Sequence, residues 1–438
     1  MIQTLKNAWK IADLRKKLLF TLMIVVLYRI GAVIPVPFVS ADMLNAYQTM
    51  YGSSIFTYLN ILSGNAFSQA TLFALGIQPY ITSSIVMQLL TISIPALERL
   101  QKDGGEEGKK KITQITRYVT VALGLITSYG YYVMLKNQGA LINSTAFIGV
   151  VIIACYCAGS ALVMWLAEKV NENGIGNGIS LILFANIISR GPSMVGGIIN
   201  MIAPYAEAGG RTFSVKGTIL AVLSIVIGLA MVAFIVFMTN SERRLPVQYA
   251  KKVVGRKMYG GQSSNLPIKL NMSGVMPIIF GNSILSIVPT IAVFTPPAAE
   301  GSFWAGFQKF FSADSWFYAV AFFALIIAFS YFYIAISFNP IEVANNLKKN
   351  GGFIPGIRPG KPTSDYISKV LSRIILIGAL FLGVIAVFPI IANIISKGAM
   401  AGLAFGGSSI IIIVGVVLET AREIEAQMTM RHYKGFLE

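Results

Sequence analysis

Charge is scarce in this chain of 438 residues. Asp, Glu, Lys and Arg make up 12% of the residues, whereas 55% are hydrophobic and the mean hydropathy is +0.70. An ordinary soluble protein has about 25% charged residues, so that class is excluded, and the apolar content excludes a disordered chain. The 41 glycines have no three-residue period, which excludes a collagen-like fibre. Apolar runs that are continuous rather than alternating predict an all-α polytopic membrane protein, not a β-barrel.

Side chains that perform chemistry are also scarce. The one histidine is His432, near the end of the chain, and the two cysteines, Cys155 and Cys157, lie in an apolar run. This pattern excludes an intramembrane metalloprotease or Ser–His protease, and we expect no metal, no cofactor and no enzymatic activity. Ser–Lys chemistry stays open by composition, although no lysine lies in a predicted span.

The 18 acidic residues all lie outside the deep part of the predicted spans. An intramembrane aspartyl protease needs two aspartates within the membrane, so this class is excluded. A transporter coupled to protons or sodium normally holds its coupling ion on a buried carboxylate, so that class is disfavoured. The glycine-rich segments 104–110 and 356–363 have three residues between glycines where a phosphate loop has four. We therefore expect a passive conduit or scaffold, or one that takes energy from a partner.

The apolar runs predict ten spans. They lie at about 18–36, 77–92, 117–135, 147–167, 178–197, 218–239, 272–294, 316–338, 370–394 and 401–418. With the N-terminus inside, the inner segments carry 28 of the 35 basic residues, the outer segments carry six, and Arg29 lies within the first span. Because basic loops stay on the cytoplasmic side, both termini are predicted to be cytoplasmic. Arg29 is expected to have a structural role, snorkelling or pairing with a helix end.

The stretch 53–94 is too polar and too interrupted for one lipid-facing helix. It predicts a short re-entrant helix at about 55–70, a break, and a spanning helix at about 77–92, because irregular backbone at membrane depth needs protein or water around it. The alternative is one helix broken by Pro79. Two long basic inner loops, 240–271 and 339–369, predict a binding partner; the alternative is that their charge only sets orientation.

Six segments resemble the signatures of the bacterial SecY family, the protein-conducting channel of the general secretory pathway. They are YRIG (28–31), ALGIQPYITSSIVMQLL (74–90), GIGNGISLILFANI (174–187), ERRLPVQYAKK (242–252), NLKKNGGFIPGIRPGK (346–361) and FGGSSIIIIVGVVLE (405–419). The resemblance implies two pseudo-symmetric five-helix halves, 1–205 and 206–438, around an hourglass pore. It also implies that the re-entrant segment, about 54–69, is a plug that seals the outer funnel.

The resemblance also assigns roles to individual residues. The pore ring would be Ile81, Ile85, Ile179, Leu183, Ile279 and Ile412, with Ile278 and either Ile411 or Ile413 as adjacent alternatives to the last two. An apolar constriction of this kind blocks ions by dewetting; the alternative is that these are ordinary core aliphatics. The centre of the plug would be Leu59, Asn60, Ile61, Leu62, Ser63, Gly64 and Asn65; the alternative is a loop packed on the outer surface.

A lateral gate would be held by polar residues at helical spacing, for which the alternative is routine helix–helix packing. They are Ser84, Gln88, Asn282, Ser283 and Ser286. The loops would bind SecA or the ribosome through basic residues, with Arg358 at the position of a functionally critical arginine of the family. These are Arg243, Arg244, Lys251, Lys252, Arg256, Lys257, Arg358 and Lys361.

The implied function is the central channel subunit of the preprotein translocase in the plasma membrane. It would conduct unfolded polypeptides across the membrane and release hydrophobic segments into lipid through the lateral gate. The implied partners are the SecE and SecG subunits, the SecA motor ATPase, the ribosome, signal sequences and nascent or unfolded preproteins, and membrane lipid. The competing hypotheses are a secondary transporter of a small solute, which lacks its buried carboxylate here, and an intramembrane enzyme, which lacks its catalytic pairs.

Overall fold

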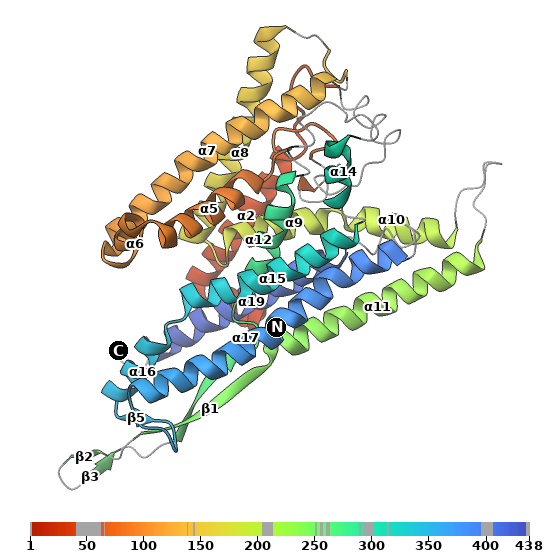
Figure 1. Ribbon diagram of the computed structural model, residues 1–438. Helices are drawn as coiled ribbons and strands as arrows, with labels where there is room; N and C mark the ends of the chain where they lie inside the picture. Colours follow the sequence, from red (N-terminus) through yellow and green to blue (C-terminus); the bar gives the residue numbers. More distant parts are fainter. Residues whose placement is uncertain are drawn as a thin grey trace.

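The computed structural model is built mainly from helices (Figure 1). It describes residues 2–40, 63–64, 66–137, 139–142, 145–203, 213–249, 252–254, 257–259, 263–288, 291, 302–312, 315–395 and 406–434. The helices before residue 204 are α1 (Ile2–Lys10), α2 (Ala12–Gly31), α5 (Gln78–Ser93), α6 (Pro95–Lys102), α7 (Gly105–Asn137), α8 (Ala146–Asn173), α9 (Gly178–Ser189) and α10 (Gly191–Ile202).

The second part of the chain adds more helices and a small sheet. The helices are α11 (Val215–Asn240), α12 (Met276–Leu285), α14 (Phe303–Phe310), α15 (Trp316–Ser337), α16 (Pro340–Lys349), α17 (Lys361–Ile395) and α19 (Gly406–Lys434). The strands are β1 (Glu242–Tyr249), β2 (Lys252–Val254), β3 (Lys257–Tyr259), β4 (Ser263–Lys269) and β5 (Gly352–Phe353). The predicted boundary between halves, 205/206, lies outside the described residues.

Five of the described helices are long and apolar enough to cross a membrane: α7, α8, α11, α15 and α17. A sixth is added if α5 and α6, which meet at an angle of 104°, count as one span, and α9 and α12 are shorter apolar helices. These helices support a multi-pass membrane protein. The count of ten spans stays a prediction, although a described helix overlaps each of the ten predicted ranges.

Helix ends follow local sequence signals. The predicted span 178–197 is divided at Arg190, the residue between α9 and α10, and Pro192 occupies the first turn of α10, where proline is tolerated. The predicted span that begins at 272 becomes helical only at Met276, with Pro277 in its first turn. A proline in the first turn has no N–H to leave unsatisfied, so it favours a start at this point.

The two predicted inner loops contain regular structure. In the first, β1 and β4 form an antiparallel hairpin that pairs from Glu242 with Lys269 to Gln248 with Ser263, and β2 pairs with β3 beyond it. In the second, β5 adds to β1, with Gln248 opposite Phe353. The hairpin, β5 and α16 lie at one end of the bundle, at the lower left of Figure 1. The two loops predicted separately from sequence therefore form one three-stranded sheet.

The segment 66–77 is a series of buried turns rather than the end of a helix, so the helix predicted to reach about residue 70 does not extend that far. Its backbone is bound from several sides: Tyr131 Oη donates to the carbonyl of Phe67 at 2.6 Å, and Val36 N donates to the carbonyl of Ala70 at 3.0 Å. These bonds satisfy a buried irregular backbone, as membrane depth demands. The spanning helix predicted at 77–92 is present as α5, Gln78–Ser93.

Candidate functional site

The residues predicted to form the pore ring come from four helices, α5, α9, α12 and α19, two in each half of the chain. Ile81, Ile85, Leu183, Ile279 and Ile412 are all at most 5% exposed and belong to one apolar cluster, against which Ile179 packs. The neighbouring Ile278 and Ile411 are buried in the same cluster. A constriction lined only by such aliphatic side chains has no polar group that could replace the water molecules around an ion. Assigning the six residues to a ring stays a prediction.

Local signals place one of these helices, α9. Asn177 caps α9 by accepting hydrogen bonds from the backbone N–H groups of Ile179, at 3.0 Å, and Ser180, at 3.3 Å. A Cβ on Gly178 would collide with the carbonyl oxygen of Ala167 in α8, so only glycine allows this approach. The start of α9 is thus held tightly against α8, and Ile179 is its second residue.

A polar contact crosses between the two halves where the gate was predicted. Gln78 Nε2, at the start of α5, donates a hydrogen bond of 3.2 Å to Ser286 Oγ at the C-terminal end of α12. Ser286 was predicted as a gate residue from sequence, but Gln78 was missed. The signal available was a glutamine directly before Pro79, at the start of an apolar helix. The structure therefore adds Gln78 to the candidate gate.

The other predicted gate residues have different surroundings. Ser283 Oγ donates to the carbonyl of Ile279 within its own helix at 2.8 Å, and Asn282, Ser84 and Gln88 are partly buried. On α5 the fully buried hydroxyl is that of Ser83, which donates to the carbonyl of Thr116 in α7 at 2.8 Å. The gate assignment of Ser84, Gln88, Asn282 and Ser283 stays a prediction.

Most of the predicted plug lies outside the described residues, including Leu59, Asn60, Ile61, Leu62 and Asn65. Ser63 is buried and its hydroxyl accepts a hydrogen bond from Phe67 N at 3.0 Å. Gly64 has a φ of +64°, and a Cβ there would lie 3.0 Å from Arg29 Nη1 and from Asn186 Oδ1. Arg29 therefore lies against the chain at Gly64, beside α9.

The predicted partner-binding residues that the structure describes lie on the strands of the first loop, on the turn that follows β5 and at the start of α17. The side chains of Arg243, Arg244, Arg358 and Lys361 are exposed, and Arg244 Nε pairs with Glu242 Oε1 at 2.7 Å. Lys252 in β2 pairs with Tyr259, and Lys257 in β3 pairs with Val254. Lys251 and Arg256 lie outside the described residues. Because β5 pairs with β1, the turn that carries Arg358 is attached to the same sheet as Arg243. The basic residues of both loops can thus meet one partner.

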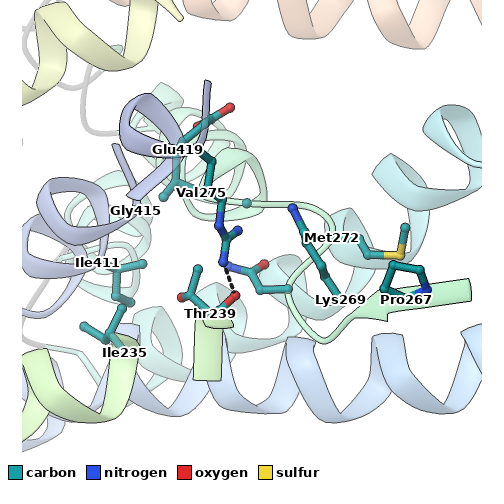
Figure 2. A pocket seen from close by; sticks show the side chains of 12 residues that line it. Ile235, Thr239, Pro267, Lys269, Met272, Val275, Ile411, Gly415 and Glu419 are labelled. Carbon is teal, nitrogen blue, oxygen red and sulfur yellow. Dashed lines mark hydrogen bonds between the residues drawn. The ribbon is translucent and has the colours of Figure 1, made fainter. Parts of the chain in front are cut away.

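A pocket of about 430 Å³ lies where the hairpin joins the helices (Figure 2). The residues that line it come from α11, β4, the segment 271–275 and α19: Ile235, Thr239, Pro267, Lys269, Asn271, Met272, Gly274, Val275, Ile411, Gly415, Glu419 and Arg422. Arg422 Nη2 donates to the carbonyl of Thr239 at 2.9 Å and to Asn240 Oδ1 at 2.8 Å. The pocket therefore touches both the base of the hairpin and the apolar cluster.

The charges around the pocket influence each other. Burial raises the pKa of the Glu419 carboxyl and Glu423 raises it further, while Arg422 and Lys269 oppose the rise. Burial also lowers the pKa of the Lys269 amine, helped by Arg422. The two cations Lys269 and Arg422 lie near the two carboxylates Glu419 and Glu423, so the charges balance and the pocket is not an anion site. Within the described ranges, no group of three or more His, Cys, Asp or Glu residues could hold a metal ion.

Comparisons with known proteins agree on one family. The family model described as SecY matches residues 71–421, well over half of the chain. The chain is 45% identical over 451 residues to "Protein translocase subunit SecY" of Streptomyces galbus, with 100% of both chains covered, and 41% identical over 457 residues to the protein of that name from Mycobacterium bovis, again with 100% of both covered.

Solved structures share the fold. One, described as showing that the plug domain of the SecY protein stabilises the closed state, has a TM-score of 0.62 at 18% identity, covering 94% of this chain and 92% of the other. Sec61 in the canine ribosome–channel complex has a TM-score of 0.60 at 18% identity with the same coverage.

Proposed function

Because the chain belongs to the SecY family, we propose that it is the central channel subunit of a protein translocase, a passive pore for unfolded polypeptides that also releases hydrophobic segments sideways into the bilayer. The observation that carries the proposal is the 45% identity over the whole length to a protein translocase subunit. The apolar cluster that joins α5, α9, α12 and α19 supports it, because an apolar throat could surround an extended chain without binding its polar groups.

The proposed architecture has ten spans in two pseudo-symmetric halves, 1–205 and 206–438, with a plug at about 54–69 and both termini in the cytoplasm. The multi-pass fold and the placement of the hairpin, β5 and α16 at one end support this arrangement. With that end in the cytoplasm, the basic residues of the sheet would face partners there, as the charge bias of the loops predicts.

The proposed partners are the SecE and SecG subunits, the SecA motor ATPase, the ribosome, and signal sequences with their preproteins. Exposed cations on one sheet suit acidic partners such as ribosomal RNA or an acidic motor surface. A solved relative of the same fold is a channel within a ribosome complex, which supports the ribosome as one of them. The chain itself is proposed to hydrolyse nothing, so the motor or the ribosome supplies the energy.

The test is reconstitution of the complex with SecE and SecG in liposomes, with SecA, ATP and a preprotein that carries one cysteine. In a background with Cys155→Ala and Cys157→Ala, a cysteine at Ile81 or Ile279 should crosslink to the translocating chain. The control is Ile219→Cys on α11, because the Ile219 side chain is 63% exposed on the surface of the helix bundle and should not crosslink. Protease-protected preprotein with no crosslink at Ile81 or Ile279 would contradict the pore path, and no protected preprotein would contradict the function.

A further inference from the structure

Two adjacent residues of α19 bind opposite halves of the chain. Arg422 donates from Nη2 to the carbonyl of Thr239, in the last turn of α11, at 2.9 Å. Glu423 Oε2 accepts a hydrogen bond from the backbone N–H of Gly176, before α9, at 2.8 Å. Hydrogen bonds with one ionised partner are the strong ones, so these two contacts fix α19 relative to both halves.

The Glu423 contact holds a loop that has little freedom of its own. Gly176 has a φ of +88°, a conformation that favours glycine. On either side of it, Ile175 N donates to Thr21 Oγ1 of α2 at 3.1 Å, and Gly178 N donates to Asn171 Oδ1 of α8 at 2.7 Å. Glu423 thus completes a set of contacts that fixes where α9 starts.

The Arg422 contact holds the base of the hairpin. It lies where α11 ends and β1 begins, and Leu270 N closes the same base by donating to the carbonyl of Ser241 at 2.9 Å. About two turns earlier in α19, Gly415 packs so closely on Val275, the residue before α12, that a Cβ on Gly415 would collide with it. The helix α19 therefore sets the position of the hairpin base and of the start of α12.

From these contacts we infer that Glu423 and Arg422 are positioning residues: from one turn of α19 they hold the start of α9 and the hairpin base, and so fix the spacing of the ring-bearing helices α9 and α12. This inference rests on the proposed function. It also assigns a role to the GIGNG motif at 174–178: the motif presents the backbone N–H of Gly176 to Glu423 in the second half of the chain. Loss of either contact lets the two helices separate and the apolar cluster admit water and ions.

The test measures ion flux through the resting complex in liposomes, together with SecA-driven translocation. Glu423→Leu removes the acceptor for Gly176 N and should raise resting ion flux about tenfold, since loss of a charge-assisted bond shifts a two-state equilibrium by that order. Glu423→Gln keeps an amide oxygen that can accept from Gly176 N and should restore the seal. Glu425→Leu, which removes the same charge from an exposed position on the same helix, is the matched control.

The outcomes separate the inference from the proposed function. A Glu423→Leu complex as tight as wild type, or a Glu423→Gln complex as leaky as Glu423→Leu, would overturn the inference while wild-type translocation stands. Wild-type complexes that seal but translocate nothing would overturn the proposed function instead. Should Glu423→Leu fail to accumulate in membranes, Arg422→Met tests the other contact, with the same rise in flux expected and an unchanged flux counting against the inference.

Discussion

The side-chain amide of Gln78 donates a hydrogen bond of 3.2 Å to the hydroxyl of Ser286, which lies 208 residues further along the chain. Gln78 begins α5 and Ser286 follows α12, so this bond links the first half of the chain to the second. The Ser286 hydroxyl donates its proton to the carbonyl of Ser283 at 2.7 Å, so its oxygen acts as the acceptor for Gln78. This bond joins two helices of the proposed lateral gate, and we expect it to help hold that gate closed.

We predict that Gln78→Leu and Ser286→Ala each make the gate easier to open. A hydrogen bond between membrane helices contributes about 0.6–2 kcal/mol, so a preprotein with a weakened signal sequence should be translocated about threefold to thirtyfold faster by either variant. The double variant should add little to either single one, because both remove the same bond. Ser93→Ala is the control on the same helix, because the Ser93 hydroxyl is exposed and donates to the carbonyl of Leu89 within α5 at 3.0 Å. An equal gain from this variant would disprove the role of Gln78.

A second prediction concerns the apolar cluster. Ile279→Lys places a charge among side chains that are nearly inaccessible to solvent, so water must enter with it. Resting ion flux in liposomes should rise by about tenfold or more, because the constriction no longer dewets. Ile279→Leu keeps volume and polarity and should stay sealed. If the lysine variant were equally tight and secreted normally, Ile279 would not line the constriction.

A third prediction concerns the basic turn after β5. Arg358 is exposed and its backbone carbonyl accepts a hydrogen bond from Thr363 Oγ1 at 2.8 Å, which holds the turn in place without using the guanidinium. Arg358→Glu should lower the stimulation of SecA ATPase by about tenfold, through like-charge repulsion from an acidic partner. The resting seal should not change. Lys216→Glu, at the start of α11, carries the same charge reversal on the predicted outer side and should have no effect on the motor.

A fourth prediction concerns the ion pair between α7 and α8. Arg117 Nε donates to both carboxylate oxygens of Glu168, at 3.1 and 2.9 Å, and the Glu168 side chain is 8% exposed. Because Arg117 is 44% exposed and partly solvated, Glu168→Gln should lower the free energy of unfolding by about 1–3 kcal/mol rather than the larger loss typical of a fully buried pair. Thermal unfolding of the purified protein in detergent measures this loss.

The neighbouring pair provides the control for that measurement. Lys169 and Glu172 are three residues apart in α8 and form an ion pair on its surface, with a distance of 2.6 Å from Nζ to Oε2. Exposed pairs contribute about 0–1 kcal/mol, so Glu172→Gln should change stability by less than Glu168→Gln. Equal losses in the two variants would show that burial of Glu168 adds nothing.

Much of the fold follows from residue type alone. The break between α9 and α10 at Arg190, the start of α5 beside Pro79 and the long helix α11 all lie close to where the sequence places them. Hydropathy and proline act locally, through the solvent that a segment prefers and through its own backbone, so they need no knowledge of neighbours. The predicted end of the re-entrant helix, at about residue 70, was wrong because distant residues determine the backbone there. Residues 66–77 form turns, and groups far away in the sequence, such as Tyr131, hold them by hydrogen bonds.

The partners of individual side chains required the tertiary structure. From the sequence, polar residues of α5 could be recognised as gate candidates, but not which of them bond to other helices. In the structure, Gln78 and Ser83 make the long-range hydrogen bonds. Successive residues of a helix point about 100° apart, so neighbouring residues face different helices. Sequence alone determined a charge-poor, multi-pass membrane protein with a basic surface at one end. Only the packing of helices against each other decided that Glu423 meets Gly176 and that β5 joins β1, since those contacts depend on how each helix is rotated and shifted along its neighbour.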